Sequence, residues 1–111
     1  MSQLEVVDVD AAQRLINDGA LLLDVREDIE FEAGHAPGAR HIPLMDVPDV
    51  VDELPRDQVN ICVCRSGARS ARAAAFLLEQ GLTAMNLEGG MKAWHEAGAA
   101  LVADGGEAHV A

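Results

Sequence analysis

The feature that most constrains the fold is a strand, a short loop and a helix in immediate succession around Cys64. Residues 59–63 are apolar except for Asn60, which predicts a strand that ends at Cys64. Small and polar residues follow, and residues 70–80 then carry apolar side chains at helical spacing. A loop between a strand and a helix N-terminus binds anions, because unpaired N–H groups and the helix dipole point into it.

Cys64 is predicted to be a nucleophile. The start of a helix lowers the pKa of a nearby thiol, so that more of it is thiolate at neutral pH. Arg65 and Arg69 add fixed positive charge, and Arg72 follows one helical turn later. A cysteine in a small domain is more often an apolar core residue. Here Arg, Ser and Gly follow at once, and these are poor core residues, which favours the reactive interpretation.

Charge is distributed unevenly over a chain of single-domain length. The chain has 111 residues and a net charge of −11, of which residues 1–60 carry −10. Residues 61–111 contain four basic side chains, and three of them are Arg65, Arg69 and Arg72. This balance excludes nucleic acid and acidic membranes as partners, but it is compatible with a small anion bound at one basic loop.

Neither a membrane segment nor a secretion signal is expected. No apolar run approaches the roughly 18 residues that a membrane-spanning helix needs. The first five residues lack the basic start and apolar stretch of a signal peptide. Cys62 and Cys64 are too close in sequence for a stabilising disulfide, which fits a reducing compartment. The predicted location is the cytoplasm.

The rest of the chain alternates between strand and helix patterns. Strands are expected at 4–9, 20–25, 40–43 and 83–87, and helices at 11–17 (with Asp10 as N-cap), 27–31, 46–54 and 91–97. Residues 103–111 are small and polar and are predicted to be a flexible tail. The alternation predicts an α/β fold with a parallel sheet covered on both faces. Because sites form at the carboxyl ends of such strands, residues 24–26 and Cys64 are expected to meet.

Three motifs resemble the rhodanese family of sulfurtransferases. They are Leu-Leu-Leu-Asp-Val-Arg at 21–26, Gly-His-Ala-Pro-Gly-Ala at 34–39, and the cysteine loop at 64–69 with its helix. Gly89-Gly90 followed by Trp94 is similar to the family's last helix. The motifs keep the family's order, and the likeness covers residues 4–102 as one domain. The resemblance implies a central parallel five-stranded sheet with helices on both faces, and a cysteine that carries sulfur as a persulfide.

The resemblance also assigns roles to residues. Cys64 becomes the persulfide-forming nucleophile, and Asp24 and Arg26 become supporting residues near the site. The backbone amides that surround the sulfur, and the side chains that bind the donor, would come from Arg65, Ser66, Gly67, Ala68 and Arg69.

The sequence departs from the family pattern at three positions. Ala36 stands where a branched apolar residue is more frequent, and His41 where asparagine is frequent. Ala68 replaces an often polar residue, which removes one hydrogen bond to an incoming donor.

Other candidate residues favour structural roles. Cys62, in the middle of a strand, is predicted to be a core residue rather than a resolving thiol. His35 is predicted to make a structural hydrogen bond, because a thiolate stabilised by a helix needs no general base. Asp24 is expected to pair with Arg26 or Arg69 rather than act as an acid. The histidines lack metal-ligand spacing, so no metal or other cofactor is expected.

The leading functional hypothesis is a thiosulfate-type sulfurtransferase. Cys64 would take sulfur from a small anionic donor such as thiosulfate and pass it to cyanide or a thiol, with a protein acceptor as a further candidate. One alternative is a small phosphatase or arsenate reductase, but their related loops have five residues between cysteine and arginine, and this chain has four. The other alternative is a carrier or sensor module that holds a persulfide without turnover.

Overall fold

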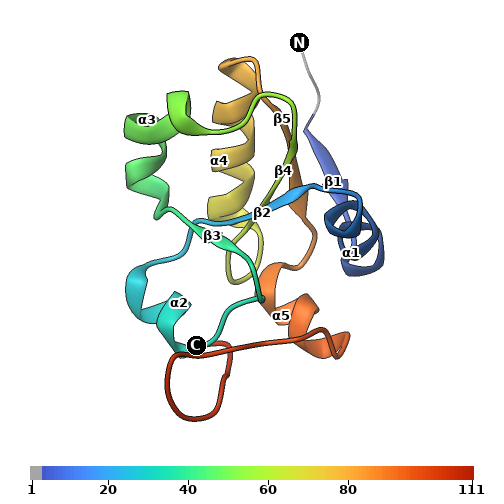
Figure 1. Cartoon of the computed structure of the whole chain (residues 1–111), viewed down its shortest axis with the longest axis vertical. Coiled ribbons are helices and arrows are strands. Elements are labelled where there is room, and N and C mark those ends of the chain that lie inside the picture. Colours follow the sequence, from blue (N-terminus) through green and yellow to red (C-terminus); the bar gives the residue numbers. More distant parts are fainter. Residues whose placement is uncertain (1–3) are drawn as a thin grey trace.

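The computed structural model describes residues 4–111 and contains one parallel sheet of five strands (Figure 1). The strands are β1 (Glu5–Val7), β2 (Leu21–Asp24), β3 (Arg40–His41), β4 (Val59–Val63) and β5 (Thr83–Leu87). Their order is β1-β5-β4-β2-β3, and every neighbouring pair is parallel. The predicted α/β class and five-stranded parallel sheet are confirmed.

Helices and helical turns connect the strands. They are α1 (Val9–Asn17), α2 (Asp28–Ala33), α3 (Val47–Val50), α4 (Ala68–Glu79) and α5 (Gly90–Glu96), with 3₁₀ turns η1 (Leu44–Asp46) and η2 (Val51–Glu53). The expected N-cap of the first helix is wrong: the Asp8 carboxylate accepts a hydrogen bond from the Ala11 amide at 2.8 Å, so the helix starts earlier. The single helix expected over 46–54 is instead a series of three short turns.

The helix after the cysteine also begins earlier than its apolar spacing indicates. Gly67 is the N-cap of α4 with φ of 120°, and Ala68 is the first helical residue. Glycine suits this position because a side chain is strained at such a φ. Residues 68 and 69 are therefore helical, and the loop proper contains only residues 65–67.

Side chains alternate along β4 and fill two cores, one on each face of the sheet. Cys62 and Cys64 join a cluster that includes Leu77 of α4 and Val47 of α3. The other cluster holds Ile61 and Val63 of β4 with residues of α1 and α5, among them Ala12, Met91 and Trp94. The sheet is thus covered on both faces, as expected.

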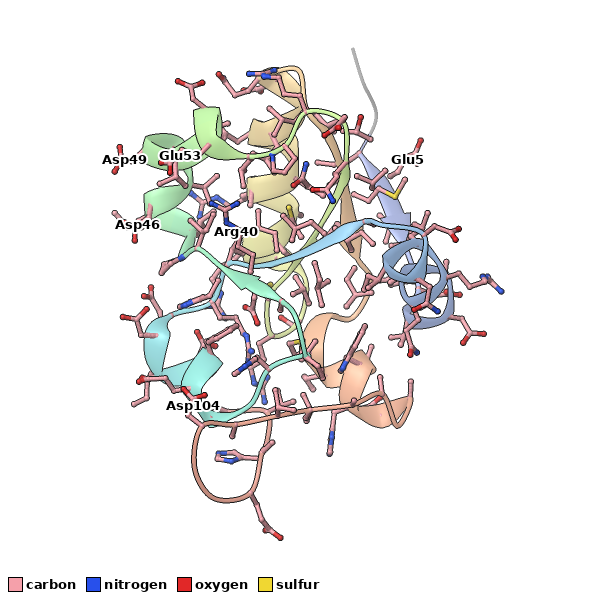
Figure 2. The ribbon with its side chains drawn as sticks, viewed as in Figure 1. Glu5, Arg40, Asp46, Asp49, Glu53 and Asp104 are labelled. Carbon is pink, nitrogen blue, oxygen red and sulfur yellow. The ribbon has the colours of Figure 1, made fainter. Side chains whose placement is uncertain are left out.

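Acidic side chains lie on the outside of the helical turns over 44–53. Figure 2 shows Asp46, Asp49 and Glu53 pointing away from the body of the protein. Across residues 4–111, no helix has the length and apolar character needed to cross a bilayer.

The segment 103–111 returns to the rest of the domain beside α2 (Figure 1). The His109 amide donates to the Ala33 carbonyl at 3.0 Å, and Val110 packs against the core cluster that contains Trp94. That this segment is flexible in solution stays a prediction.

Candidate active site

The carboxyl ends of β2 and β4 bring two of the sequence motifs together. The strands are neighbours in the sheet, with Asp24 opposite Val63. The Val25 amide continues the pairing by donating to the Val63 carbonyl at 3.0 Å. Residues 24–26 and Cys64 therefore lie at one edge of the sheet, the edge at which parallel α/β folds place their sites.

The Cys64 sulfur lies inside the turn that starts α4. Its Sγ accepts hydrogen bonds from the Gly67 amide at 3.1 Å and from the Ser70 hydroxyl at 3.3 Å. Burial by itself would raise the pKa of the Cys64 thiol, since the residue is 1 % exposed. Hydrogen bonds from the Ser70 hydroxyl and from the amides of Ser70, Gly67 and Ser66 outweigh burial, and the pKa is lowered. The environment favours a thiolate.

Helix α5 orients the loop from the opposite side. The Met91 amide donates to the Cys64 carbonyl at 2.8 Å, and the Lys92 amide donates to the Arg65 carbonyl at 3.1 Å. With these carbonyls turned toward α5, the loop's own amides are free to face the sulfur. Gly90 makes this approach possible, because a Cβ there would overlap the Cys64 carbonyl oxygen and lie 2.5 Å from the Arg65 carbonyl oxygen.

Asn86 on β5 belongs to the site, although the sequence analysis did not select it. Its Nδ2 donates to the Gly67 carbonyl at 3.1 Å, and its Oδ1 accepts from the Ser70 hydroxyl at 2.6 Å. For Ser70, too, the sequence pattern predicts only a place in the helix. The available signal was an asparagine between Met85 and Leu87, near the carboxyl end of the predicted strand, at the edge where sites form.

Arg69 is held in an ion pair rather than free for a ligand. Its Nη1 and Nη2 donate to the two carboxylate oxygens of Glu30 on α2, at 2.7 and 2.9 Å. The Arg69 hydrogen bond holds the pKa of Glu30 at about 2, well below its ordinary value, although partial burial opposes this. Glu30, like Asn86 and Ser70, is a residue of the site that the sequence pattern did not indicate. Its role is to tie α2 to the start of α4 and to compensate the Arg69 charge.

The other two arginines near the loop are exposed. Arg65 leaves the loop toward the chain's last segment, where its Nε donates to the Ala111 carbonyl at 3.0 Å. Arg72 is exposed on α4. Of the two loop arginines expected to bind an anion, the geometry therefore favours Arg65 over Arg69.

Asp24 and Arg26 form a buried pair beside the loop. Both side chains are fully buried, and Arg26 Nη2 lies 2.7 Å from Asp24 Oδ2. Arg26 also donates to the Gly34 carbonyl at 2.8 Å, which connects β2 with the Gly-His-Ala-Pro-Gly-Ala motif. Of the two arginines expected as partners of Asp24, the structure shows Arg26 and not Arg69. The pair supports the architecture of the site without contacting Cys64 through any hydrogen bond among the described residues.

The remaining candidates have structural roles. His35 Nδ1 lies 2.8 Å from the Phe31 carbonyl oxygen, as a structural hydrogen bond requires, and the Phe31 ring stacks between His35 and His41. Cys62 is fully buried, and burial raises the pKa of its thiol to about 12. Across residues 4–111, no group of three or more histidine, cysteine or acidic side chains is arranged to hold a metal ion.

Alkylation is expected to reveal one reactive thiol with a lowered pKa. The rate of iodoacetamide modification, measured against pH, should have its midpoint below the ordinary cysteine value of about 8.5. Ser70→Ala should move this midpoint upward, because a hydrogen bond to the thiolate is lost. Cys62→Ser should leave the midpoint unchanged, because burial raises the pKa of Cys62 to about 12 and keeps this thiol out of the reaction. A midpoint at or above 8.5 in the native protein would contradict the electrostatic description of the site.

Comparisons with known proteins identify the family of this chain. A model of the rhodanese-like domain matches residues 8–97. A sulfurtransferase of Allochromatium vinosum is 39% identical over 97 residues, covering 86% of this chain and 91% of its own. Thiosulfate sulfurtransferase GlpE of Pseudomonas fluorescens is 31% identical over 106 residues, covering 95% and 97%.

Solved structures show the same fold. A rhodanese-related protein of Thermoplasma volcanium superposes with a TM-score of 0.83 at 31% identity, covering 88% of this chain and 97% of that one. A Rhodopseudomonas palustris protein, described as a possible tyrosine phosphatase, has a TM-score of 0.81 at 26% identity, covering 89% and 85%. Bacillus anthracis CoADR-RHD matches 82% of this chain with a TM-score of 0.78 and 33% identity, but this chain spans only 16% of its length. The match to the family model and the full-length relatives establish that this chain belongs to the rhodanese-like domain family.

Proposed function

We propose that this protein is a thiosulfate-type sulfurtransferase with Cys64 as its sulfur-carrying nucleophile. The observation that carries the proposal is the Cys64 Sγ held between the Gly67 amide and the Ser70 hydroxyl, which lowers the pKa of the thiol. The relative named thiosulfate sulfurtransferase supports this donor class. The proposed unit is residues 4–102, acting in the cytoplasm on small molecules or on a protein thiol.

The reaction follows from a thiolate in a ring of donors. The Cys64 thiolate attacks the outer sulfur of thiosulfate, the S–S bond of the donor breaks, and sulfite leaves with the electron pair. The enzyme then holds a persulfide whose outer sulfur carries negative charge beside the loop amides. Cyanide or a thiolate attacks that outer sulfur, and the new S–S bond breaks to return the thiolate. No metal or redox cofactor enters this balance.

Arg65 is proposed to bind the anionic donor. It is the exposed arginine of the loop, whereas Glu30 compensates the charge of Arg69. Arg65→Ala should raise the KM for thiosulfate about tenfold and change kcat less than about threefold, because charge binds the donor before reaction. The change in KM should be smaller for an uncharged sulfur donor.

Arg72→Ala removes an exposed arginine outside the loop and is the matched control for Arg65→Ala. Equal losses for charged and neutral donors would instead assign Arg65 to shaping the loop.

The test of the function combines loading and turnover. Intact mass measured after incubation with thiosulfate should increase by the mass of one sulfur atom and return to its starting value after cyanide. Sustained release of thiocyanate should then distinguish an enzyme from a carrier or sensor, which loads once and stops. Absence of a mass increase would overturn the proposal.

A second candidate activity is phosphatase, because the Rhodopseudomonas palustris protein with the same fold is described as a possible tyrosine phosphatase. Phosphoryl transfer requires three equatorial oxygens to meet donors at about 2.7–3.1 Å together. The span of four residues between Cys64 and Arg69 is expected to be too narrow for this.

Hydrolysis of p-nitrophenyl phosphate should therefore be negligible for the native protein. Inserting one glycine after Gly67 should lower sulfur transfer and admit the aryl phosphate. Strong phosphate hydrolysis by the native chain would favour the phosphatase instead.

A further inference from the structure

Ser70 has one hydroxyl proton and three acceptors within reach. Its Oγ lies 2.6 Å from Asn86 Oδ1, 3.2 Å from the Gly67 carbonyl oxygen and 3.3 Å from Cys64 Sγ. A hydroxyl donates a single hydrogen bond at a time, so these acceptors compete. Both Ser70 and Asn86 are buried, which leaves little access for water to supply a second donor.

The orientation of the Asn86 amide is determined by its other contact. The Gly67 carbonyl oxygen lies 3.1 Å from Nδ2, so a flipped amide would place two carbonyl oxygens against each other. Oδ1 must therefore face Ser70. At 2.6 Å, that contact is favourable when the hydroxyl proton lies between the two oxygens.

The best acceptor for the proton depends on what Cys64 carries. A thiolate is an anion, and a charge-assisted hydrogen bond attracts the hydroxyl to Sγ. In a thiol or a persulfide, Sγ is uncharged and a weak acceptor, because the persulfide's charge is on the outer sulfur. The Asn86 carbonyl oxygen is then the better acceptor.

We propose that Asn86 is a positioning residue that acts through Ser70, taking the hydroxyl's hydrogen bond when Cys64 is loaded and releasing it when the thiolate returns. This inference rests on the proposed function, because it assigns a role within the loading cycle. During unloading, the Sγ–S bond breaks and its electron pair goes to Sγ. The Ser70 hydroxyl turns toward that growing charge and stabilises the departing thiolate. Asn86 thus favours the loaded state, and Ser70 favours its discharge.

A double-mutant cycle of Asn86→Leu and Ser70→Ala tests the sharing without any sulfur donor. The measured quantity is the Cys64 pKa from alkylation rates. Ser70→Ala should raise it, whereas Asn86→Leu in the native background should lower it, because the hydroxyl has lost its competing acceptor. In the Ser70→Ala background, Asn86→Leu should not lower it, since the effect passes through the hydroxyl. Loss of the Gly67 contact alone would raise the pKa in both backgrounds, so an upward or zero change in the native background overturns the inference.

Single-turnover cyanolysis of the preloaded proteins provides the second readout. Asn86→Leu should discharge its persulfide about two- to tenfold faster than the native protein, the range that one hydrogen bond of 0.5–1.5 kcal/mol allows. Ser70→Ala should discharge it more slowly. Equal changes of the same sign in both variants would overturn the inference and indicate a merely structural role.

A measurement on the native protein covers the case in which Asn86→Leu does not fold. The side-chain carboxamide signals of Asn86 in NMR spectra should shift on loading with thiosulfate and return after cyanide. The shift should be absent in Ser70→Ala, and a shift of equal size in that variant would contradict the proposal. If thiosulfate loads no sulfur onto the native protein, the proposed function fails, while the alkylation cycle still decides how the hydroxyl is shared.

Discussion

Cys64→Ser is expected to abolish sulfur loading and to lower thiosulfate turnover by at least about 10³-fold, because a serine hydroxyl stays protonated at neutral pH. The replacement is nearly isosteric, and its contacts with the Gly67 amide and the Ser70 hydroxyl suit an oxygen as well as a sulfur. The fold should therefore persist. Intact mass after thiosulfate treatment, steady-state turnover and thermal unfolding provide the three measurements.

Cys62→Ser is the matched control for that substitution. Cys62 lies two residues earlier on β4, is fully buried, and has its pKa raised to about 12. A buried hydroxyl in its place should reduce stability by about 1–3 kcal/mol, but loading should proceed on Cys64. Loss of loading in Cys62→Ser with loading retained in Cys64→Ser would show that the nucleophile has been misassigned.

Gly90→Ala is also expected to cause a large loss of turnover, although glycine has no reactive group. A Cβ at Gly90 would overlap the Cys64 carbonyl oxygen and come within 2.5 and 2.6 Å of the Arg65 carbonyl oxygen and carbon. These are backbone atoms of the cysteine loop and cannot move aside as a side chain can. The loop would have to shift relative to α5, breaking the bonds from the Met91 and Lys92 amides. A displacement of this size is expected to lower turnover about 10²-fold.

Gly98→Ala separates the clash from backbone strain. Gly98 has φ of +77°, compared with +59° for Gly90, but a Cβ there would meet no atom within 4 Å. Gly98→Ala should cost about 1–2 kcal/mol of stability and leave turnover intact. In Gly90→Ala, the Cys64 pKa from alkylation should also rise, because the loop amides move away from the sulfur. Equal turnover in the two variants would show that the contact between α5 and the loop does not position Cys64.

The order of the elements and the strand that leads to Cys64 could be predicted from local patterns. The apolar run 59–63 and the helical spacing after it depend only on residues close in sequence, and both were found as expected. The paired glycines at 89–90 could be matched to a family motif, but the sequence did not show why glycine is needed at these positions. It became apparent only when α5 was placed against the Cys64 carbonyl.

The residue at which α4 begins could also be determined only from the backbone conformation. The spacing of apolar residues predicts a helix that starts at residue 70. In the structure, Gly67 is the N-cap with a positive φ, and the helix starts at Ala68. The charge count likewise suggested that two loop arginines were available to an anion. It could not show that Glu30, 39 residues away from Arg69, compensates one of them.

By itself, the sequence determined the fold class and the strand–loop–helix unit, and it predicted Cys64 as the nucleophile, since periodicity and turn residues act over a few neighbouring positions. Only the tertiary structure decided which side chains complete the site. Asn86 reaches Ser70 across 16 residues because β5 lies beside β4, and Glu30 reaches Arg69 because α2 follows the adjacent β2. The strand order β1-β5-β4-β2-β3 creates these contacts. That order arises from packing the whole sheet between its two cores, which no local spacing of residues encodes.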